Sequence, residues 1–191
     1  MKRFRVVIAD PPWRFGDGLV MSKTRRGAAA HYETMSAVEI AAIPVADWCE
    51  PDAVLALWTP AALLADGMTV MASWGFRQTQ VVVWAKRNAG GALQMGMGRQ
   101  FRGACELALV GVRGSPKPAK RNERNVFECA PLGHSRKPDC LHAMMARMYP
   151  GGPFLELFAR QTVPAWTTVG LEVEAGPGAI RADLRKWRPE P

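Results

Sequence analysis

The stretch Val6-Val7-Ile8-Ala9-Asp10-Pro11-Pro12-Trp13 decides the fold of this chain. Its four apolar residues predict a buried strand that ends at an acid. The strand stops there because the two prolines that follow carry no backbone N–H to donate to a sheet. Ligands of α/β sheets bind outside the carboxyl ends of the strands, so an acid in this position predicts a ligand site.

The residues after this strand suit a pocket for a flat ring that carries an amine. An exocyclic amine has two N–H donors, of which one can go to the Asp10 carboxylate and the other to the Pro11 carbonyl. The Trp13 indole offers a face on which a base can stack, a contact worth about 1–3 kcal/mol. The competing interpretation is a proline-rich turn with Trp13 as an ordinary core residue.

The rest of the chain alternates between predicted strands and helices. Apolar runs predict strands at residues 53–59, 78–85, 105–112, 154–158 and 166–173. Helices are predicted to begin at Thr34 or Ser36, at residue 61 and at residue 137, where the spacing of Ser36 and Glu39 matches a capping box. This alternation predicts an α/β sheet with helices on both faces, and it brings Asp10 and Arg160 to one rim.

Length and composition favour one domain that covers residues 1–191, with residues 176–191 as an irregular or weakly helical tail. Residues 14–33 and 86–103 are predicted to be long loops. The chain has no run of 18 apolar residues, so we expect no membrane span. The basic residues 1–5 precede too short an apolar stretch for a signal peptide, so we expect a cytoplasmic protein.

The four cysteines, at positions 49, 105, 129 and 140, form no Cys-x-x-Cys pair. A structural zinc site needs four convergent ligands that usually come in such pairs. We therefore predict buried thiols and no metal site.

The net charge of +8 and the pI near 9.8 favour a polyanionic partner. Two basic clusters lie in predicted loops, where their side chains can reach a phosphate backbone; they comprise Lys23, Arg25 and Arg26, and Arg113, Lys117, Lys120, Arg121 and Arg124. A merely solvated basic loop has the same pattern, so this alternative stays open.

Taken together, the motifs of the chain resemble those of the MT-A70 family of adenosylmethionine-dependent adenine-N6 methyltransferases. The motifs follow the family's order over roughly residues 6–173; they are Asp10-Pro11-Pro12-Trp13, Tyr32-Glu33-Thr34-Met35-Ser36, Leu57-Trp58-Thr59, Trp84-Ala85-Lys86, Cys105-Glu106-Leu107-Ala108-Leu109-Val110-Gly111 within residues 102–111, His134-Ser135-Arg136-Lys137-Pro138-Asp139, and Leu155-Glu156-Leu157-Phe158-Ala159-Arg160.

The resemblance implies a Rossmann-like methyltransferase fold with a mostly parallel sheet, one antiparallel strand near an edge, and a permuted motif order. It implies S-adenosyl-L-methionine as the cofactor and a nucleic acid as the substrate. Its catalytic residues are then Asp10, Pro11, Pro12 and Trp13. The Asp10 carboxylate would hold the adenine amine in line with the methyl group and offset the positive charge that develops on it.

The resemblance also implies the residues around the two ligands. Lys137 is expected near the methionine carboxylate of the cofactor, Phe158 and Arg160 near its adenosine, and Glu172 on a ribose hydroxyl. The predicted cofactor residues are Ala9, Asp10, Lys137, Phe158, Arg160 and Glu172, and the predicted substrate residues are Tyr32, Lys23, Arg25, Arg26 and Arg102. The chain departs from the family at Leu171, which stands where the family often has Asn, so part of the cofactor site is in doubt.

Several alternatives stay open at this point. We favour DNA over RNA, since the chain is compact and carries no added RNA-binding module, but an RNA adenine-N6 methyltransferase fits the same motifs. A non-catalytic nucleic-acid-binding subunit that pairs with an active homologue is a second alternative, and a methyltransferase for a small molecule or a protein amide is a third. A homodimer or a heterodimer with a related subunit is compatible with each of these functions.

Overall fold

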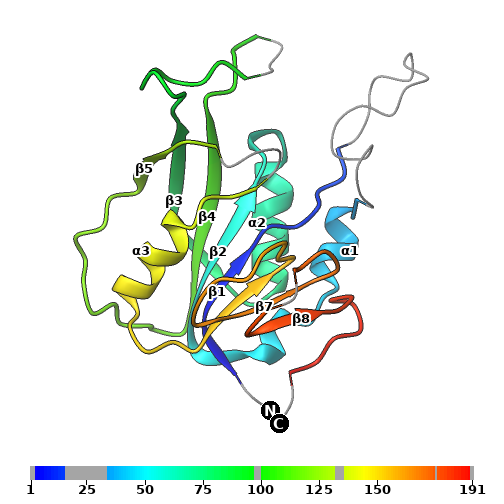
Figure 1. The fold of residues 1–191 in the computed structure, drawn as a ribbon. Helices are drawn as coiled ribbons and strands as arrows, with labels where there is room; N and C mark the ends of the chain where they lie inside the picture. Colours follow the sequence, from blue (N-terminus) through cyan, green and yellow to red (C-terminus); the bar gives the residue numbers. More distant parts are fainter. Residues whose placement is uncertain (1–2, 16–33, 97–99, 132–135, 175, 190–191) are drawn as a thin grey trace.

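The computed structural model describes residues 3–15, 34–96, 100–131, 136–174 and 176–189. Eight strands and three α-helices make up these parts (Figure 1). The strands are β1 (Phe4–Ala9), β2 (Cys49–Thr59), β3 (Arg77–Lys86), β4 (Cys105–Arg113), β5 (Val126–Cys129), β6 (Phe154–Leu157), β7 (Trp166–Gly170) and β8 (Ala179–Arg181). The helices are α1 (Ala37–Ala41), α2 (Leu64–Ser73) and α3 (Cys140–Met148), with 3₁₀ turns at η2 (Val45–Trp48) and η3 (Ala61–Leu63).

All eight strands belong to one sheet in the order β5-β3-β4-β2-β1-β6-β7-β8. β1 is central and pairs in parallel with β2 and β6, and its apolar run Val6-Val7-Ile8-Ala9 is buried as predicted. β4 runs antiparallel to both β2 and β3, and every other pairing is parallel. The single antiparallel strand is therefore confirmed, but it lies third from the β5 edge because β3 and β5 both extend the sheet beyond it.

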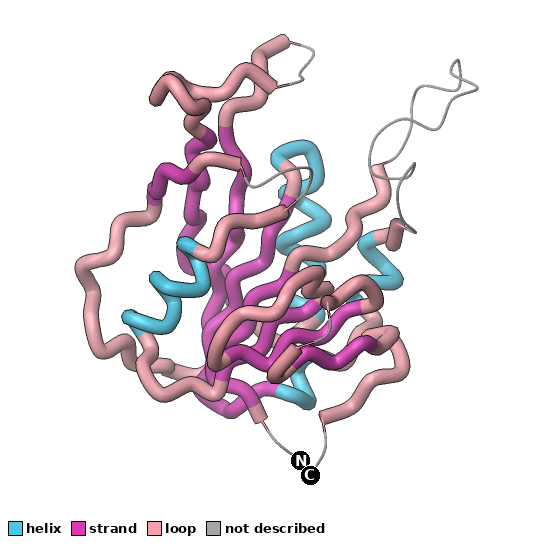
Figure 2. Tube along the Cα trace, in the orientation of Figure 1, coloured by secondary structure: helices cyan, strands magenta, loops and turns pink. Residues whose placement is uncertain are grey.

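Helices cover both faces of the sheet, as expected for a Rossmann-like methyltransferase fold (Figure 2). On one face, Val70 of α2, Trp74 at its C-terminal end and Ile40 of α1 pack in the same core as Leu55 and Leu57 of β2. On the other face lies α3, in the core lined by alternate residues of β1 and β2 (Leu141 and Met145 with Val6, Ile8, Val54 and Ala56). Successive side chains of a strand point to opposite faces of the sheet, so β1 and β2 each contribute residues to both cores.

Local signals explain where α1 and α2 begin and end. Ser36 caps α1, and its side chain and that of Glu39 form both bonds of a capping box, as predicted. The predicted helix at residues 61–74 begins as the 3₁₀ turn η3 and continues as α2. It ends before Gly75, whose φ of 78° suits the left-handed residue that closes a helix.

A buried contact between two polar side chains connects α3 to the sheet. His142 Nε2 lies 3.0 Å from Glu156 Oε2, and both side chains are almost inaccessible. The His142 ring also meets the Trp166 ring edge-on, with 4.8 Å between the ring centres. Glu156 lies in an otherwise apolar strand, and the imidazole is the polar group that the structure places beside its carboxylate.

Three features of the fold differ from the sequence-based expectations. β5 and β8 are strands that no apolar run predicted, and β8 turns part of the tail into the last strand of the sheet. Cys129 and Cys140 form a disulfide, so the prediction of buried thiols is wrong for both, since β5 and the start of α3 bring them together. Cys105 is a free but exposed thiol, which is also contrary to that prediction, whereas Cys49 is free and buried.

Among the described residues, no helix has the length and apolar character that crossing a membrane requires.

Candidate active site

The polar residues that follow the strands gather along one edge of the sheet, which is formed by the carboxyl ends of the parallel strands. Asp10 follows β1, Arg160 comes soon after β6 and Glu172 soon after β7. Since β4 is antiparallel, its first residues, Cys105 and Glu106, lie at this same edge beside Lys86 at the end of β3. Two cavities open here, and Asp10, Pro12 and Arg160 line both of them.

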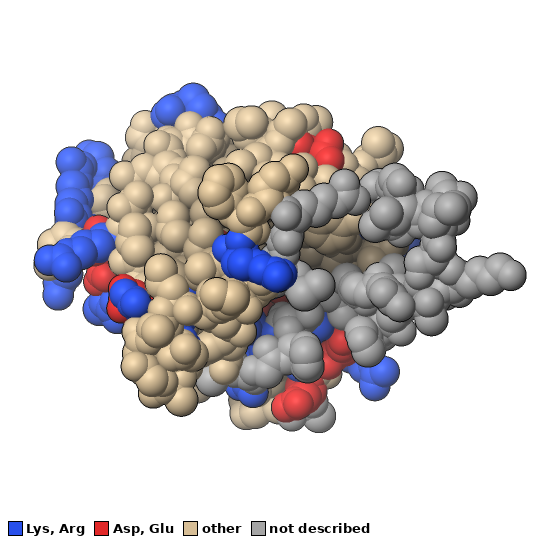
Figure 3. All heavy atoms as spheres, turned by 90° about the horizontal axis from the view of Figure 1, so that it is seen from above, with Lys and Arg blue, Asp and Glu red and all other residues tan. Residues whose placement is uncertain are grey.

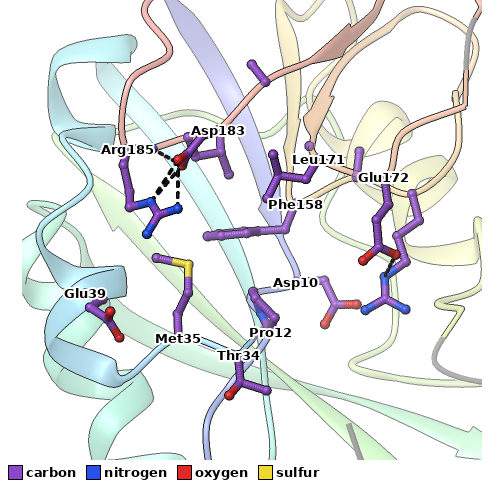
Figure 4. A pocket seen from close by; sticks show the side chains of 15 residues that line it. Asp10, Pro12, Thr34, Met35, Glu39, Phe158, Leu171, Glu172, Asp183 and Arg185 are labelled. Carbon is purple, nitrogen blue, oxygen red and sulfur yellow. Dashed lines mark hydrogen bonds and ion pairs between the residues drawn. The ribbon is translucent and has the colours of Figure 1, made fainter. Parts of the chain in front are cut away.

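The first cavity, which we name the β6–β8 cavity, is built from residues that follow β6, β7 and β8 together with residues 34–39. The Phe158 ring lies across its middle, between Leu171 on one side and Met35 on the other (Figure 4). Phe158 has a φ of 62°, a left-handed conformation that is costly for a bulky residue. Such strain is typical of functional sites, and here it accompanies a ring that points into the cavity.

Carboxylates lie at opposite sides of the Phe158 ring in this cavity (Figure 4). Asp183 is held by Arg185, whose Nε lies 2.9 Å from Oδ1 and whose backbone N–H donates to the same oxygen at 3.0 Å. The hydrogen bond from the Arg185 side chain lowers the pKa of Asp183, so this carboxylate stays charged. On the other side, the Glu172 carboxylate lies 3.9 Å from Arg160 Nε. The cavity thus offers an aromatic face with acceptors at each end.

The second cavity, the β2–β4 cavity, contains a row of alternating charges. Lys137 Nζ lies 2.9 Å from Asp10 Oδ2 and 3.3 Å from Glu106 Oε2. Lys86 Nζ lies 2.5 Å from the other Glu106 oxygen. The Lys137 ammonium also lies 5.6 Å from the centre of the Trp58 ring, close enough for a cation–π contact.

The charges in this row shift each other's pKa. Burial alone would lower the pKa of Lys137, but the carboxylates of Asp10 and Glu106 outweigh it and raise this pKa above its ordinary value. Burial alone would raise the pKa of Glu106, but Lys137 and Lys86 outweigh it and lower this pKa. Lys137 and Glu106 are therefore both charged at neutral pH, and Lys137, paired with both carboxylates, fixes the Asp10 side chain from one side.

The Asp-Pro-Pro-Trp turn is more strongly tied to the protein than the sequence predicted. Trp13 is only 5% exposed, and its indole N–H donates to the Trp58 carbonyl at 2.9 Å. Trp13 still lines the β2–β4 cavity, so it forms part of a wall and not an open stacking face. The Pro11 carbonyl already accepts a hydrogen bond from the Trp13 N–H at 2.9 Å, which leaves one of its two lone pairs for a ligand. Pro12 accepts one from Met35 at 2.8 Å.

Four of the predicted cofactor residues, Asp10, Phe158, Arg160 and Glu172, line the β6–β8 cavity together. Ala9 lines neither cavity, because it is fully buried between β2 and β6 in the centre of the sheet. Lys137 lines the β2–β4 cavity and pairs with Asp10, so the structure does not put it in the β6–β8 cavity with the other predicted cofactor residues.

The predicted substrate residues are only partly visible. Arg102 is exposed beside the β2–β4 cavity and lines neither cavity. Tyr32, Lys23, Arg25 and Arg26 lie outside the described residues, as do His134 and Ser135 of the resemblance motifs.

Sequence reasoning missed several residues of the site. Glu106 and Lys86 belong to motifs of the resemblance, but the sequence assigned no function to either side chain. Their pairing depends on the antiparallel register of β3 and β4. Asp183 and Arg185 lie in the tail that was predicted to be irregular. The buried Leu184 between them was the available signal, because an apolar residue in a polar tail indicates that the tail packs against the domain.

No group of three or more His, Cys, Asp or Glu side chains that could hold a metal ion is found in the described part of the chain.

Comparison with known proteins agrees with this geometry. The model of the MT-A70 family matches residues 4–172, which is most of the chain. The Type II methyltransferase M.MunI of a Mycoplasma species is 28% identical over 189 residues, covering 90% of this chain and 78% of the relative. The N(6)-adenosine-methyltransferase MT-A70-like of Arabidopsis thaliana is 29% identical over 95% of this chain but 25% of its own length.

For a third relative, the share of its own length that the match covers lies between those of the first two. The N6-methyladenosine RNA methyltransferase MTA1 of Cryphonectria parasitica is 28% identical over 89% of this chain and 52% of its own length. The chain therefore spans about a quarter of the length of the Arabidopsis relative and about half of the length of the Cryphonectria relative. The family match over residues 4–172, on a sheet whose edge carries the Asp-Pro-Pro-Trp turn between two cavities, shows that this chain belongs to the MT-A70 family of N6-adenine methyltransferases.

Proposed function

We propose that this protein transfers a methyl group from S-adenosylmethionine to the N6 amine of adenine in DNA. The observation that carries the proposal is the pair of cavities that meet at Asp10 and Pro12. A transferase must hold two ligands with their reacting atoms about 3–3.5 Å apart, so its two binding sites must share a wall at the reaction centre. Here the shared wall is the turn that follows β1.

The chemistry of the β6–β8 cavity fits an adenosyl group. The Phe158 ring is an aromatic face for a purine, and Asp183 and Glu172 supply charged acceptors for an exocyclic amine and for ribose hydroxyls. When bound, S-adenosylmethionine supplies a methyl group made electrophilic by a positively charged sulfur. The acidic residues along this cavity suit a ligand of positive charge.

Asp10 carries the chemistry on the protein side. Its carboxylate accepts an N6–H of the target adenine, while the remaining lone pair of the Pro11 carbonyl accepts the other. These bonds hold the amine for in-line attack, and the carboxylate offsets the positive charge that develops on N6. The ion pair with Lys137 at 2.9 Å keeps the carboxylate in one orientation before the substrate arrives. Tyr32, Lys23, Arg25, Arg26 and Arg102 remain the predicted contacts to the nucleic acid.

The match in length favours DNA as the substrate. M.MunI, a Type II methyltransferase, is covered over 78% of its length, and the relatives named for adenosine or RNA methylation over a quarter to a half of theirs. The net charge of +8 suits either polyanion. A target adenine in duplex DNA must leave the stack to reach Asp10, so single strands are the easier substrate.

The proposal is tested with purified protein, radiolabelled S-adenosylmethionine, and genomic DNA that offers every sequence context. Duplex DNA, the same DNA denatured by heat and cooled rapidly, and total RNA are compared, and digested products are analysed for N6-methyladenine. We expect label in DNA that Asp10→Ala abolishes. Label in RNA alone would assign the RNA activity instead. Binding of S-adenosylhomocysteine without any transfer would favour a requirement for a second subunit.

A further inference from the structure

An arm of the chain connects β3 to β4 and carries exposed apolar side chains. Its described parts are residues 87–96 and 100–104, and it projects beyond the sheet (green, at the top of Figure 1). Phe101 is 90% exposed, Met95 is 81% exposed and Leu93 is 53% exposed. Large apolar residues usually contribute to a hydrophobic core, but none of these three side chains packs in one.

The backbone of the arm borders the β2–β4 cavity close to two of these residues in the sequence. The Gly96 N–H donates to the Gly103 carbonyl at 2.9 Å, and both glycines line that cavity. A Cβ on Gly96 would lie 2.5 Å from the Gly103 oxygen, so only glycine permits this close approach. Met95 directly precedes Gly96 and Phe101 is two residues before Gly103, so both belong to segments that border this cavity.

The exposed apolar residues are gathered here and not scattered over the protein. Eight large apolar side chains are exposed among the described residues, and four of them belong to the arm or to the lining of the β2–β4 cavity: Phe15, Leu93, Met95 and Phe101. Single exposed apolar residues need no explanation, but a group around one cavity indicates a binding surface.

The charge beside this group fits a polyanion. Arg102 follows Phe101, is exposed, and forms no ion pair with any residue in the described ranges. Arg87, by contrast, is held at 2.6 Å by Glu128. Seen from the end where the arm projects, the surface shows Lys and Arg side chains in several places, with Asp and Glu side chains beside some of them (Figure 3). A partner with stacked apolar rings inside and phosphates outside matches this combination.

We propose that the arm is a wedge that opens duplex DNA, with Phe101 and Met95 inserted between bases next to the target adenine. The inference rests on the proposed function and adds to it how the base is extruded. Proteins that bend or open DNA insert apolar side chains between base steps, and an extruded base leaves a gap that such a side chain can fill. Phe101 fills the gap, Arg102 contacts the adjacent phosphate, and the adenine enters the cavity beside Gly96 and Gly103.

The test compares Phe101→Ala with the wild type on duplex DNA and on the same DNA denatured by heat. A wedge contributes only where a stack must be opened, so the duplex rate should fall about tenfold or more while the single-strand rate stays within about twofold. Phe101→Trp should retain the duplex rate, because an indole also fills the gap. Met68→Ala is the matched control, since Met68 is an exposed apolar residue of α2 that lines neither cavity.

Other outcomes overturn the inference. If the duplex and single-strand rates of Phe101→Ala fall equally, or neither changes, Phe101 is not a wedge. An equal fall together with a smaller oligomer in light scattering assigns the arm to a protein partner. A wild type that methylates denatured DNA but not duplex DNA removes the wedge and leaves the proposed function standing. If the wild type methylates neither, the proposed function fails, and the wedge fails with it.

Discussion

Lys137 Nζ lies 2.9 Å from Asp10 Oδ2, although 127 residues separate the two in the chain. The same ammonium lies 3.3 Å from Glu106 Oε2, so one cation holds two carboxylates apart in a largely buried place. Without it, two like charges would face each other across this part of the site. The orientation of Asp10 thus depends on Lys137.

Lys137→Met is expected to lower kcat about 100-fold through the loss of this preorganisation. Affinity for S-adenosylhomocysteine, measured by calorimetry, should stay nearly unchanged, because Lys137 does not line the β6–β8 cavity. Lys86→Met is the control, since Lys86 pairs with Glu106 and not with Asp10. The opposite pattern, weaker binding with an unchanged kcat, would return Lys137 to the methionine carboxylate.

Glu106 is expected to make stability depend on pH in the acidic range. Its pKa in the folded protein lies below the ordinary value of 4.5, because Lys137 and Lys86 outweigh its burial. Its contribution to the free energy of unfolding is therefore complete above about pH 4.5 and is lost as the pH falls through the lower folded value. Urea unfolding between pH 3 and 7 should show that the difference in free energy of unfolding between wild type and Glu106→Gln narrows at low pH. A difference in free energy of unfolding between wild type and Glu106→Gln that stays constant at every pH contradicts the prediction.

Asp183→Asn is expected to weaken binding of S-adenosylhomocysteine about tenfold, as is typical when a charged acceptor is lost. Asparagine keeps the oxygen that accepts the Arg185 backbone N–H, so the turn should survive. Its amide also presents N–H groups where the adenine amine needs an acceptor. The variant should therefore lose much less affinity for S-inosylhomocysteine, whose ring has an oxygen in place of the amine. Equal loss for both ligands would show that Asp183 acts through the turn alone.

Gly170→Ala is expected to displace the backbone that holds the Phe158 ring in the β6–β8 cavity. A Cβ at Gly170 would lie 2.2 Å from the Ala159 carbonyl oxygen, and Ala159 follows Phe158 in the turn that aims the ring. Overpacking of this kind costs about 1–3 kcal/mol of stability. Chemical denaturation should report that loss, and S-adenosylhomocysteine should bind more weakly. Gly90→Ala, where the nearest atom is the Asn88 side-chain oxygen at 3.4 Å, should behave like the wild type.

Leu171→Asn is expected to raise affinity for S-adenosylhomocysteine severalfold. Leu171 lines the β6–β8 cavity and is 53% exposed, so its side chain contributes little to the core. An amide at this position supplies the hydrogen bonds that leucine cannot make to a ribose. The melting temperature should change little. Unchanged or weaker binding would mean that Glu172 and Arg160 already complete this part of the site.

The sequence predicted most of the fold because its long elements carry strong local patterns. β1, β2, β3 and β4 have continuous apolar runs, and α1 has a capping box, so their positions follow from neighbouring residues alone. β5 and β8 have four and three residues, and such short strands exist only because a longer strand beside them supplies hydrogen bonds. A local pattern cannot contain that information.

The site was predictable to the same extent. Asp10, Phe158 and Arg160 follow buried strands, and the rule that ligands bind at strand ends locates them. The ion pair of Lys137 with Asp10 and the approach of Asp183 to Phe158 are contacts across more than 20 residues, which strand and helix patterns do not encode. The free carbonyl expected at Pro11 was only half correct, because the turn uses one of its lone pairs internally.

The wall of the β6–β8 cavity includes both Asp10 and Arg185, which come from opposite ends of the sequence. During synthesis the first of these leaves the ribosome long before the second. The wall of this cavity is therefore complete only when residue 185 has emerged. A chain that stops before residue 185 lacks part of this wall, and immobilised S-adenosylhomocysteine should retain it less well than the longer chain.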